Sequence, residues 1–311
     1  MADAPHQHAQ NILDIIEGEP IPPVHALSVA DAREQFRGAT TLTDGPDVDD
    51  VRDFEIQGPG GALPVRLYLP EGDGPHPVLV FFHGGGWVLG DVESHDNQCR
   101  SLSNAADCAV LSVDYRRPPE HAFPAAVEDA YAAVEWVAEH GEQVDLDTDR
   151  IAVGGDSAGG NLTAATTLVL QDRGGPDVVH QLLAYPMVAS PAVHDFDSYA
   201  ENAEGYFLES AAIEWFVDCY VTDRRDLRNE YFAPLLARDL SDVPPATVVT
   251  AGFDPLRDEG VAYADHLDAN GVPTDHYHYE DMIHGFLGMV GMVDAAADVV
   301  ERIGVDLADA F

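Results

Sequence analysis

The sequence predicts an α/β protein whose mostly parallel sheet carries helices on both faces. Short apolar runs recur along the chain and alternate with stretches in which apolar residues return at helical spacing. Some runs, such as residues 78–82, are apolar at every position, as expected of central parallel strands that are buried on both faces. With 311 residues, 46% of them hydrophobic, the chain can form one sizeable core with an appended subdomain.

Eight segments have the composition of strands. The first two form a hairpin, because the second alternates between apolar and other residues and a turn rich in glycine and proline joins them. The expected strands are residues 51–56, 63–69, 78–82, 109–114, 151–153, 180–185, 246–251 and 275–279. The helices expected between and after them are residues 96–106, 124–140, 161–172 and 260–270, and one that begins near residue 294.

Two stretches interrupt this alternation. Residues 1–50 have the pattern of two short helices and an acidic loop, too short for a domain but apolar enough to need a partner surface. Residues 187–240 hold helical patches and many aromatic side chains. We therefore expect residues 51–186 and 241–311 to form one α/β domain, with the two remaining stretches outside its sheet.

A serine stands at the turn between an expected strand and an expected helix. Residues 154–160 contain the pattern Gly155-x-Ser157-x-Gly159, which is typical of a nucleophile elbow. Glycines two residues before and after the serine avoid the collisions that side chains would make on so sharp a turn. The following helix points its first N–H groups toward the reacting oxygen. Ser157 is therefore the candidate nucleophile.

A serine hydroxyl needs an adjacent base, and that base needs an orienting carboxylate. His284 is the candidate base, because it follows an expected strand and ligands bind at the carboxyl ends of parallel strands. Asp254 follows the preceding strand in the same way and is the candidate acid. Asp258 and Glu259 are alternatives that we expect instead to cap and charge the start of the next helix. The strand histidines His276 and His278 are expected to be ordinary strand residues.

Attack by the serine creates an oxyanion that needs preorganised N–H donors. The sequence His83-Gly84-Gly85-Gly86 follows the third expected strand, and its glycines let backbone amides face a site without side chains between. We expect the donors to be the amides of Gly85, Gly86 and Ala158. His83 is expected to hold the loop by hydrogen bonds rather than to take part in the chemistry.

The chain resembles the hormone-sensitive-lipase-like group of bacterial and archaeal α/β-hydrolase esterases over nearly its whole length. Four of the matching motifs occur in the order that the group shows, and Ser157, Asp254 and His284 follow the α/β-hydrolase order of nucleophile, acid and base. The matching residues are His83-Gly84-Gly85-Gly86-Trp87, Tyr115-Arg116, Pro119-Glu120-His121, Phe123-Pro124-Ala125-Ala126, Gly155-Asp156-Ser157-Ala158-Gly159, Asp254-Pro255-Leu256-Arg257-Asp258-Glu259-Gly260 and His284-Gly285-Phe286.

The resemblance implies an α/β-hydrolase fold with an eight-stranded sheet and a helical cap. The cap of this group is built from the N-terminus and an insertion after the sixth strand, which would be residues 1–50 and 187–240. It also implies that Glu120 and His121 form structural hydrogen bonds. The chain departs from the group at Arg117-Pro118, where relatives usually carry Leu-Ala, in a loop that we expect to be structural.

A serine carboxylesterase for short- to medium-chain acyl esters is the activity that the resemblance implies, without a metal or organic cofactor. Among the cap aromatics, Tyr206, Phe207 and Trp215 are candidates for lining the acyl pocket. The alternatives are hydrolysis of another acyl bond, as in an acetylated sugar or drug, an amide or a carbamate, and a non-catalytic receptor. The plant gibberellin receptor is similar to these esterases but lacks the catalytic histidine, which is present here as His284.

The charge of the chain is strongly negative. It has 56 Asp and Glu against 15 basic residues, all of them Arg, which gives a formal net charge of −41. This field would repel nucleic acid and anionic membranes. Because the acidic residues are spread over the whole chain, we interpret them as a surface adapted to molar salt, where the Debye length falls to about 3 Å, and the source as a halophile.

Partners and compartment follow from the same sequence. No run of about 18 apolar residues predicts a membrane span, and the N-terminus lacks the basic and apolar regions of a signal peptide. Cys99, Cys108 and Cys219 make no disulfide framework, and no zinc-type spacing occurs. We expect a cytoplasmic protein that acts on a small ester, with a homodimer left open.

Overall fold

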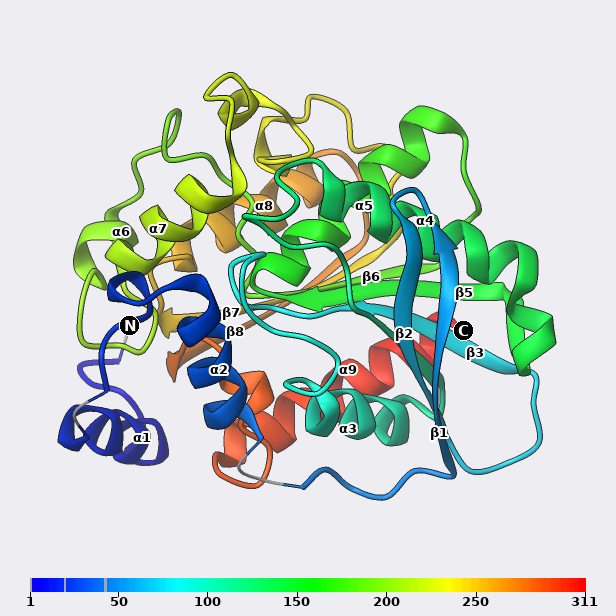
Figure 1. Cartoon of the computed structure of the whole chain (residues 1–311), viewed down its shortest axis with the longest axis horizontal. Coiled ribbons are helices and arrows are strands. Elements are labelled where there is room, and N and C mark those ends of the chain that lie inside the picture. Colours follow the sequence, from blue (N-terminus) through cyan, green and yellow to red (C-terminus); the bar gives the residue numbers. More distant parts are fainter. Residues whose placement is uncertain (1, 20, 42–43) are drawn as a thin grey trace.

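One mixed sheet forms the centre of the computed structural model, which describes residues 2–19, 21–41 and 44–311 (Figure 1). In this part of the chain eight strands lie in the order β1-β2-β4-β3-β5-β6-β7-β8, which confirms the expected α/β fold and its eight strands. The strands are β1 Asp50–Gly58, β2 Gly61–Leu69, β3 His76–Phe82, β4 Ala109–Val113, β5 Leu146–Asp156, β6 His180–Ala184, β7 Ala246–Phe253 and β8 Thr274–Ile283.

The direction of the strands divides the sheet in two. The hairpin of β1 and β2 is antiparallel, and β2 pairs antiparallel with β4. The pairs from β4 through β3, β5, β6 and β7 to β8 are all parallel. The carboxyl ends of the parallel strands therefore lie at one edge of the sheet. The residues that follow β3, β5, β7 and β8 meet at this edge.

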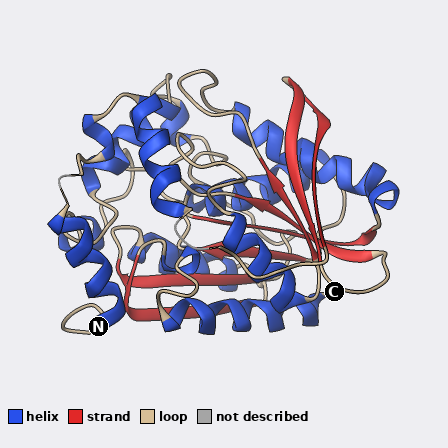
Figure 2. Cartoon of the chain, turned by 60° about the horizontal axis from the view of Figure 1, so that its bottom comes forward, coloured by secondary structure: helices blue, strands red, loops and turns tan. Residues whose placement is uncertain are grey.

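Helices cover both faces of the sheet, as Figures 1 and 2 show. Helices α3 and α9 pack together on one face, and α4, α5 and α8 contact strands from the other. No helix in the described ranges is long and apolar enough to cross a membrane. These helices are α3 Asp96–Ala106, α4 Ala125–His140, α5 Ala158–Arg173, α8 Arg257–Ala269 and α9 Asp294–Ala310.

The two stretches that do not fit the alternation pack against each other outside the sheet. Ala32 of the N-terminal part and Phe216 of the insertion share an apolar cluster with Leu89, which follows β3. Residues 1, 20, 42 and 43 of the first stretch lie outside the described residues. The helices of the two stretches are α1 Gln7–Gly18, α2 Val29–Thr40, α6 Asp197–Glu201 and α7 Ser210–Tyr220, with single 3-10 turns at Val24–Ala26, Asp226–Arg228 and Pro234–Leu236.

Helix α1 lies against the end of the last strand. Ala9 and Leu13 of this helix pack on Ile283, the final residue of β8. The amide of His6 donates to the carbonyl oxygen of Asp281 at 2.8 Å. Residues of β8, far along the chain, therefore hold the first helix in place.

Several boundaries differ from the sequence prediction, and two of them lie next to a candidate residue of the site. Strand β8 continues to Ile283 rather than residue 279, because it pairs with β7 beyond a register shift near Gly252. His284 is thus the first residue after the strand. Helix α8 begins at Arg257 rather than residue 260, so only a short turn separates the end of β7 at Phe253 from this helix.

Two glycines give opposite predictions for replacement by alanine. A Cβ on Gly159 would lie 1.8 Å from the carbonyl oxygen of Phe82, whereas a Cβ on Gly38 in α2 would meet nothing within 4 Å. We expect Gly159→Ala to lower the free energy of unfolding by about 1–3 kcal/mol or more. Gly38→Ala, the matched control, should raise it by about 0.5–1 kcal/mol. Urea unfolding in one buffer measures both, and equal stability of Gly159→Ala and the wild type would refute the packing argument.

Candidate active site

Ser157 occupies the turn between β5 and α5. Its φ of 56° and ψ of −117° lie in a region that non-glycine residues rarely adopt. The turn is tight because a Cβ on Gly155 would lie 2.4 Å from the carbonyl oxygen of Phe82. The amide of Ser157 donates to the carbonyl oxygen of Ala184 at 2.8 Å, which secures the turn against β6.

The three residues predicted as a triad form one chain of hydrogen bonds. The Ser157 Oγ lies 2.9 Å from Nε2 of His284, and Nδ1 of His284 lies 2.8 Å from Oδ2 of Asp254. Asp254 is fully buried, and its other carboxylate oxygen accepts a hydrogen bond from the amide of Leu256 at 2.8 Å. The carboxylate of Asp254 favours the tautomer of His284 with the proton on Nδ1. Nε2 is then free to accept the proton of the serine hydroxyl.

Two glycines follow Gly84, whose amide binds the side chain of Asp156, the residue before the serine. Gly85 and Gly86 have φ values of 111° and 58°, which glycine adopts without strain. Among the described residues, no hydrogen-bond partner takes up either amide. Ala158 is the first residue of α5, where helical amides lack a partner within the helix. A Cβ on Gly86 would overlap the ring of Phe216 at 2.2 Å, so position 86 accepts only glycine.

The buried side chains of Asp156 and His95 fix the start of this loop. The amide of Gly84 donates to Oδ1 of Asp156 at 2.9 Å, and Nε2 of His95 lies 3.3 Å from the same oxygen. Burial opposes ionisation of Asp156, but the charge of His95 and the hydrogen bonds from His95 and Gly84 outweigh it and lower its pKa. Asp156 thus satisfies a backbone amide beside the elbow. The sequence did not indicate that His95 has this role.

His83 supports the loop from a fully buried position. Its ring stacks on Tyr115 at 4.2 Å, and its Nδ1 lies 2.8 Å from the carbonyl oxygen of Gly84. Complete burial lowers the pKa of His83 to about 3, so the ring is neutral at physiological pH. The hydrogen-bonding role expected for His83 is therefore confirmed.

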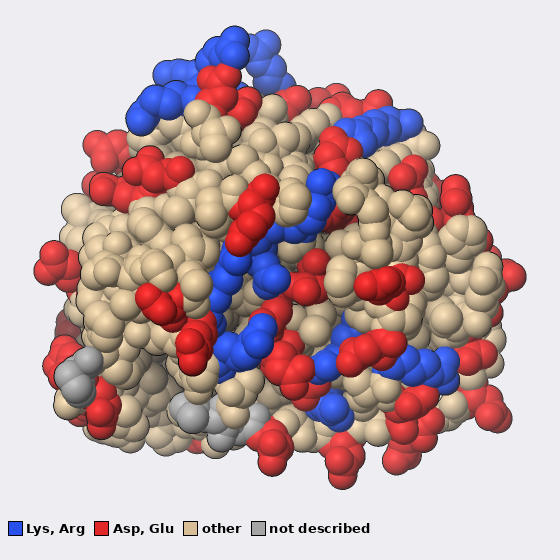
Figure 3. Space-filling model, in the orientation of Figure 1, with Lys and Arg blue, Asp and Glu red and all other residues tan. Residues whose placement is uncertain are grey.

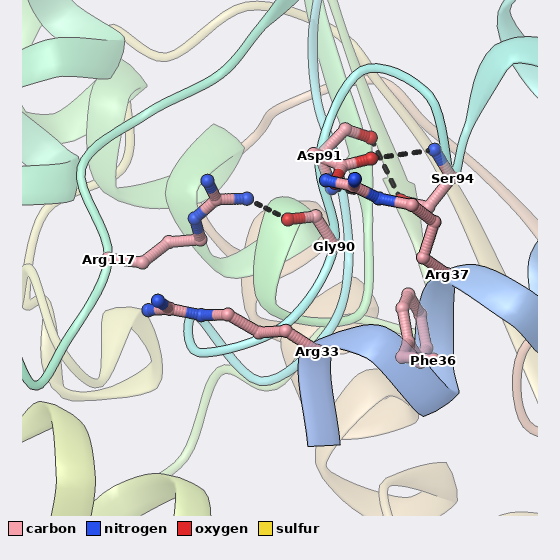
Figure 4. Close-up of a pocket in the computed structure, with 7 residues that line it drawn as sticks. All are labelled: Arg33, Phe36, Arg37, Gly90, Asp91, Ser94 and Arg117. Atoms are coloured by element: carbon pink, nitrogen blue, oxygen red, sulfur yellow. Dashed lines mark hydrogen bonds and ion pairs between the residues drawn. The ribbon is translucent and has the colours of Figure 1, made fainter. Parts of the chain in front are cut away.

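Arginines hold the continuation of the loop, around a small cavity of about 40 Å³ (Figure 4). Arg33 and Arg37 of α2 reach it: Arg33 donates to the carbonyl oxygen of Val88 at 2.9 Å, and Arg37 pairs with Asp91. Arg117, which departs from the usual residue of the group, donates to the carbonyl oxygen of Gly90. The α2 helix is thus tied to the segment that leads away from the glycine amides.

Glu120 completes this connection. Its carboxylate accepts two hydrogen bonds from Arg33, at 2.9 and 2.8 Å. These bonds lower the pKa of Glu120 to about 2. The structural role expected for Glu120 is confirmed, because its carboxylate binds Arg33 of α2 and not a residue of the triad.

The two carboxylates that were set aside as triad members are engaged elsewhere. Asp258 accepts a hydrogen bond from the amide of Ser198 at 2.9 Å. Glu259 accepts bonds from the amides of Val188 and Ala189, at 2.6 and 3.1 Å. Both lie in the first turn of α8, as expected of acidic residues at the start of a helix. The prediction that they cap the helix was wrong, since they bond to residues that follow β6.

Glu259 is a fully buried carboxyl group. Besides the two amides, it accepts a bond from the hydroxyl of Tyr199. Burial raises its pKa to about 8, against these three hydrogen bonds, which favour the ionised form. At neutral pH the group is therefore mostly protonated in the folded protein.

Two of the three aromatic residues predicted to line an acyl pocket pack beside loops of the triad, and the third packs on another ring. The ring of Tyr206 packs on Phe253, next to Asp254, and a Cβ on Gly285 would lie 3.2 Å from Phe207. Trp215 packs on Phe216 at 5.3 Å. It is Phe216 that covers Gly86, and the sequence analysis did not single it out.

His276 and His278, the other two histidines considered, form hydrogen bonds within the sheet. His276 and His278 both bond to the hydroxyl of Thr250, at 2.8 and 2.9 Å, as ordinary strand residues do. Within the described ranges, no three His, Cys, Asp or Glu side chains converge as ligands of a metal ion would.

A serine, a histidine and a buried aspartate at the carboxyl edge of a mostly parallel sheet define the class of α/β hydrolases. The family model of the α/β-hydrolase fold matches residues 79–288. Esterase LipI of Mycobacterium tuberculosis is 45% identical over 257 residues, which cover 81% of this chain and 79% of that protein. Ethyl acetate hydrolase of Pseudomonas putida is 36% identical, with 88% of each chain covered.

A solved structure agrees over the whole molecule. The hyperthermophilic esterase from the archaeon Pyrobaculum calidifontis has a TM-score of 0.94 and 38% identity, with 98% of each chain covered. The chain belongs to the hormone-sensitive-lipase-like esterase group of the α/β-hydrolase family. It is a carboxylic ester hydrolase whose catalytic nucleophile is a serine.

The raised pKa of Glu259 predicts a pH-dependent stability. The ordinary value is 4.5, so between about pH 4.5 and 8 the folded protein keeps a proton that the unfolded chain loses. The stability that this group contributes is complete below pH 4.5 and is lost as the pH rises through 8. Glu259→Gln cannot ionise, and its free energy of unfolding should gain on the wild type by up to about 1.4 kcal/mol per pH unit in this window.

Guanidinium unfolding of both proteins from pH 5 to 9 in one salt concentration measures this difference. The glutamine side chain preserves an oxygen for the two amides, so the comparison isolates ionisation. A difference between the two proteins that stays constant over this range would show that Glu259 titrates normally.

Proposed function

We propose that Ser157, His284 and Asp254 are the nucleophile, base and acid of this esterase. The observation that carries the proposal is the continuous hydrogen-bond chain from Ser157 Oγ to His284 and on to buried Asp254. The strained conformation of Ser157 supports it, because such backbone geometry persists where function requires it.

The geometry supports a two-stage acyl transfer. His284 Nε2 takes the proton from Ser157 Oγ, which attacks the carbonyl carbon of the ester. The tetrahedral oxyanion accepts hydrogen bonds from the amides of Gly85, Gly86 and Ala158. His284 then protonates the leaving alcohol, and the C–O bond breaks to give an acyl-enzyme. Water, deprotonated by His284, attacks this ester and releases the acid.

The substrates that we propose are esters with short- to medium-chain acyl groups. The name of the Pseudomonas putida relative, ethyl acetate hydrolase, supports a small acyl group. Phe216 lies over Gly86, and Phe207 lies beside Gly285, so aromatic rings stand close to the loops of the triad and the amides. Tyr206 and Trp215 remain candidates for the acyl pocket. Hydrolysis of another acyl bond uses the same triad and is distinguished by substrate screening.

We also propose that residues 1–50 and 187–240 act as a cap on a catalytic domain of residues 51–186 and 241–311. The apolar cluster shared by Ala32, Phe216 and Leu89 supports this division, because it joins both stretches to the loop after β3. A receptor without catalysis, the other alternative, is disfavoured by the intact contact between Ser157 and His284.

Adaptation to molar salt is a further part of the proposal. If every Arg were neutralised by one acid, 56 − 15 = 41 carboxylates would still lack a cation. In Figure 3 the acidic side chains are scattered over the visible face, while the arginines gather mainly along its middle. Repulsion between so many carboxylates falls when salt shortens the Debye length from about 10 Å at 0.1 M to about 3 Å at 1 M.

The first test is Ser157→Ala with p-nitrophenyl butyrate. Removal of the nucleophile should lower kcat to below a few per cent of the wild-type value with an unchanged circular dichroism spectrum, because no acyl-enzyme can form. A fluorophosphonate should label the wild type at Ser157 and leave the variant unlabelled.

Retained hydrolysis above a few per cent in Ser157→Ala would refute the choice of serine. A series of esters from acetate to palmitate tests the substrate class in the same assay. Preference for the longest chains, or for long-chain triglyceride, would contradict the short- to medium-chain proposal.

The second test is the dependence on KCl and NaCl. We expect the melting temperature and kcat/KM for p-nitrophenyl butyrate to rise from dilute buffer into the molar range, because screening weakens repulsion between surface carboxylates. Both salts should act alike if screening is the cause. Full activity and an unchanged melting temperature in dilute buffer would refute salt adaptation.

A further inference from the structure

One short helix of the insertion lies directly on the loop that carries Asp254. Helix α6 runs from Asp197 to Glu201 and ends at Asn202. Ser198 and Asn202 are four residues apart, so one turn of helix places them on the same face. That face contacts residues 252–258, the segment between β7 and the first turn of α8.

Asn202 binds two backbone carbonyl groups, one on each side of Phe253, the residue before the acid. Its Nδ2 donates to the carbonyl oxygen of Gly252 at 3.2 Å and to that of Asp254 at 3.0 Å. The side chain is buried, with 4% of the residue exposed. An amide nitrogen carries two N–H groups, so a single side chain satisfies both carbonyl groups.

Ser198 binds the next peptide of the same loop. Its Oγ donates to the carbonyl oxygen of Pro255 at 2.7 Å, and its own amide donates to Asp258 at 2.9 Å. Glu201 adds an ion pair to Arg257 at 2.8 Å. One helical turn thus holds three backbone carbonyl groups, those of Gly252, Asp254 and Pro255, and the side chains of Arg257 and Asp258.

These bonds decide where the carboxylate of Asp254 can lie. Within its own loop, the side chain accepts one hydrogen bond, from the amide of Leu256. The carbonyl groups of Gly252, Asp254 and Pro255 point instead toward α6. Without Asn202 and Ser198, the buried carbonyl group of Pro255 would lose its partner. The carbonyl groups of Gly252 and Asp254 would keep only their bonds from Arg257, whose Nη1 lies 3.4 Å from the first and whose amide lies 3.1 Å from the second. The peptide planes would then be freer to turn.

We propose that Asn202, together with Ser198, is a positioning residue for the triad acid. It acts through the backbone of Asp254 and touches neither the substrate nor the reacting atoms. The inference rests on the proposed role of Asp254. It means that the insertion holds part of the catalytic geometry, besides any wall that it provides for the substrate.

The test is a double-mutant cycle with p-nitrophenyl butyrate. We expect Asn202→Ala to lower kcat about tenfold or more, because small displacements of a catalytic group are costly, and to leave KM within about twofold. In the background of Asp254→Asn, the same change should have no further effect on kcat, since the carboxylate to be positioned is gone.

Asn229→Ala is the matched control. Asn229 lies in the same insertion and accepts a hydrogen bond from the amide of Tyr231 at 2.9 Å, away from the loop of the acid. This variant should keep the wild-type kcat. A loss of kcat in Asn229→Ala equal to that of Asn202→Ala would overturn the inference, because any disturbance of the insertion would then suffice.

Other outcomes are equally decisive. A kcat within twofold of the wild type for Asn202→Ala, a loss that appears only in KM, or a loss that multiplies fully with Asp254→Asn would each overturn the inference. A wild-type kcat for Asp254→Asn would instead refute the proposed triad. If Asn202→Ala does not fold, Ser198→Ala, which removes one oxygen atom, takes its place in the cycle. Failure of both to fold would assign the two residues to folding and overturn the inference.

Discussion

The close approach of the start of α5 to the end of β3 is the constraint on which the site depends. Gly155 and Gly159 both face the carbonyl oxygen of Phe82, and only glycine fits at either position. This contact forces Ser157 into its strained conformation. It also brings the serine beside residues 83–86, because they directly follow Phe82. One packing contact therefore brings Ser157 close to Gly85 and Gly86, whose amides we propose as oxyanion donors, although more than 70 positions separate them from the serine in the sequence.

Each of the two outer stretches of the chain holds one loop of the site. Helix α2 reaches the loop after β3 through Arg33 and Arg37, and α6 reaches the loop after β7 through Ser198 and Asn202. At the first of these contacts, guanidinium groups make the connection. Partly buried ion pairs are screened less by salt than exposed ones, so this contact would persist at the high ionic strength to which we propose the protein is adapted.

The sequence predicted what depends on local patterns and missed what depends on contacts between distant elements. Apolar runs indicated all eight strands, and glycine spacing and strand ends indicated Ser157, Asp254 and His284. Glu259 was misread as a helix cap, because its partners after β6 lie about 70 positions away. Nothing in the sequence marks Asn202, His95 or Phe216, since an asparagine, a histidine and an aromatic residue in such surroundings are unremarkable until the fold places them beside a loop.

The position of α1 has a consequence for synthesis on the ribosome. The ribosome makes this helix long before its partners, Asp281 and Ile283. Domains fold as units during translation, from the N-terminus onward. The nascent chain therefore carries α1 without its partners while most of the sheet is made. The helix can dock only after β8, the strand that leads to His284, has emerged.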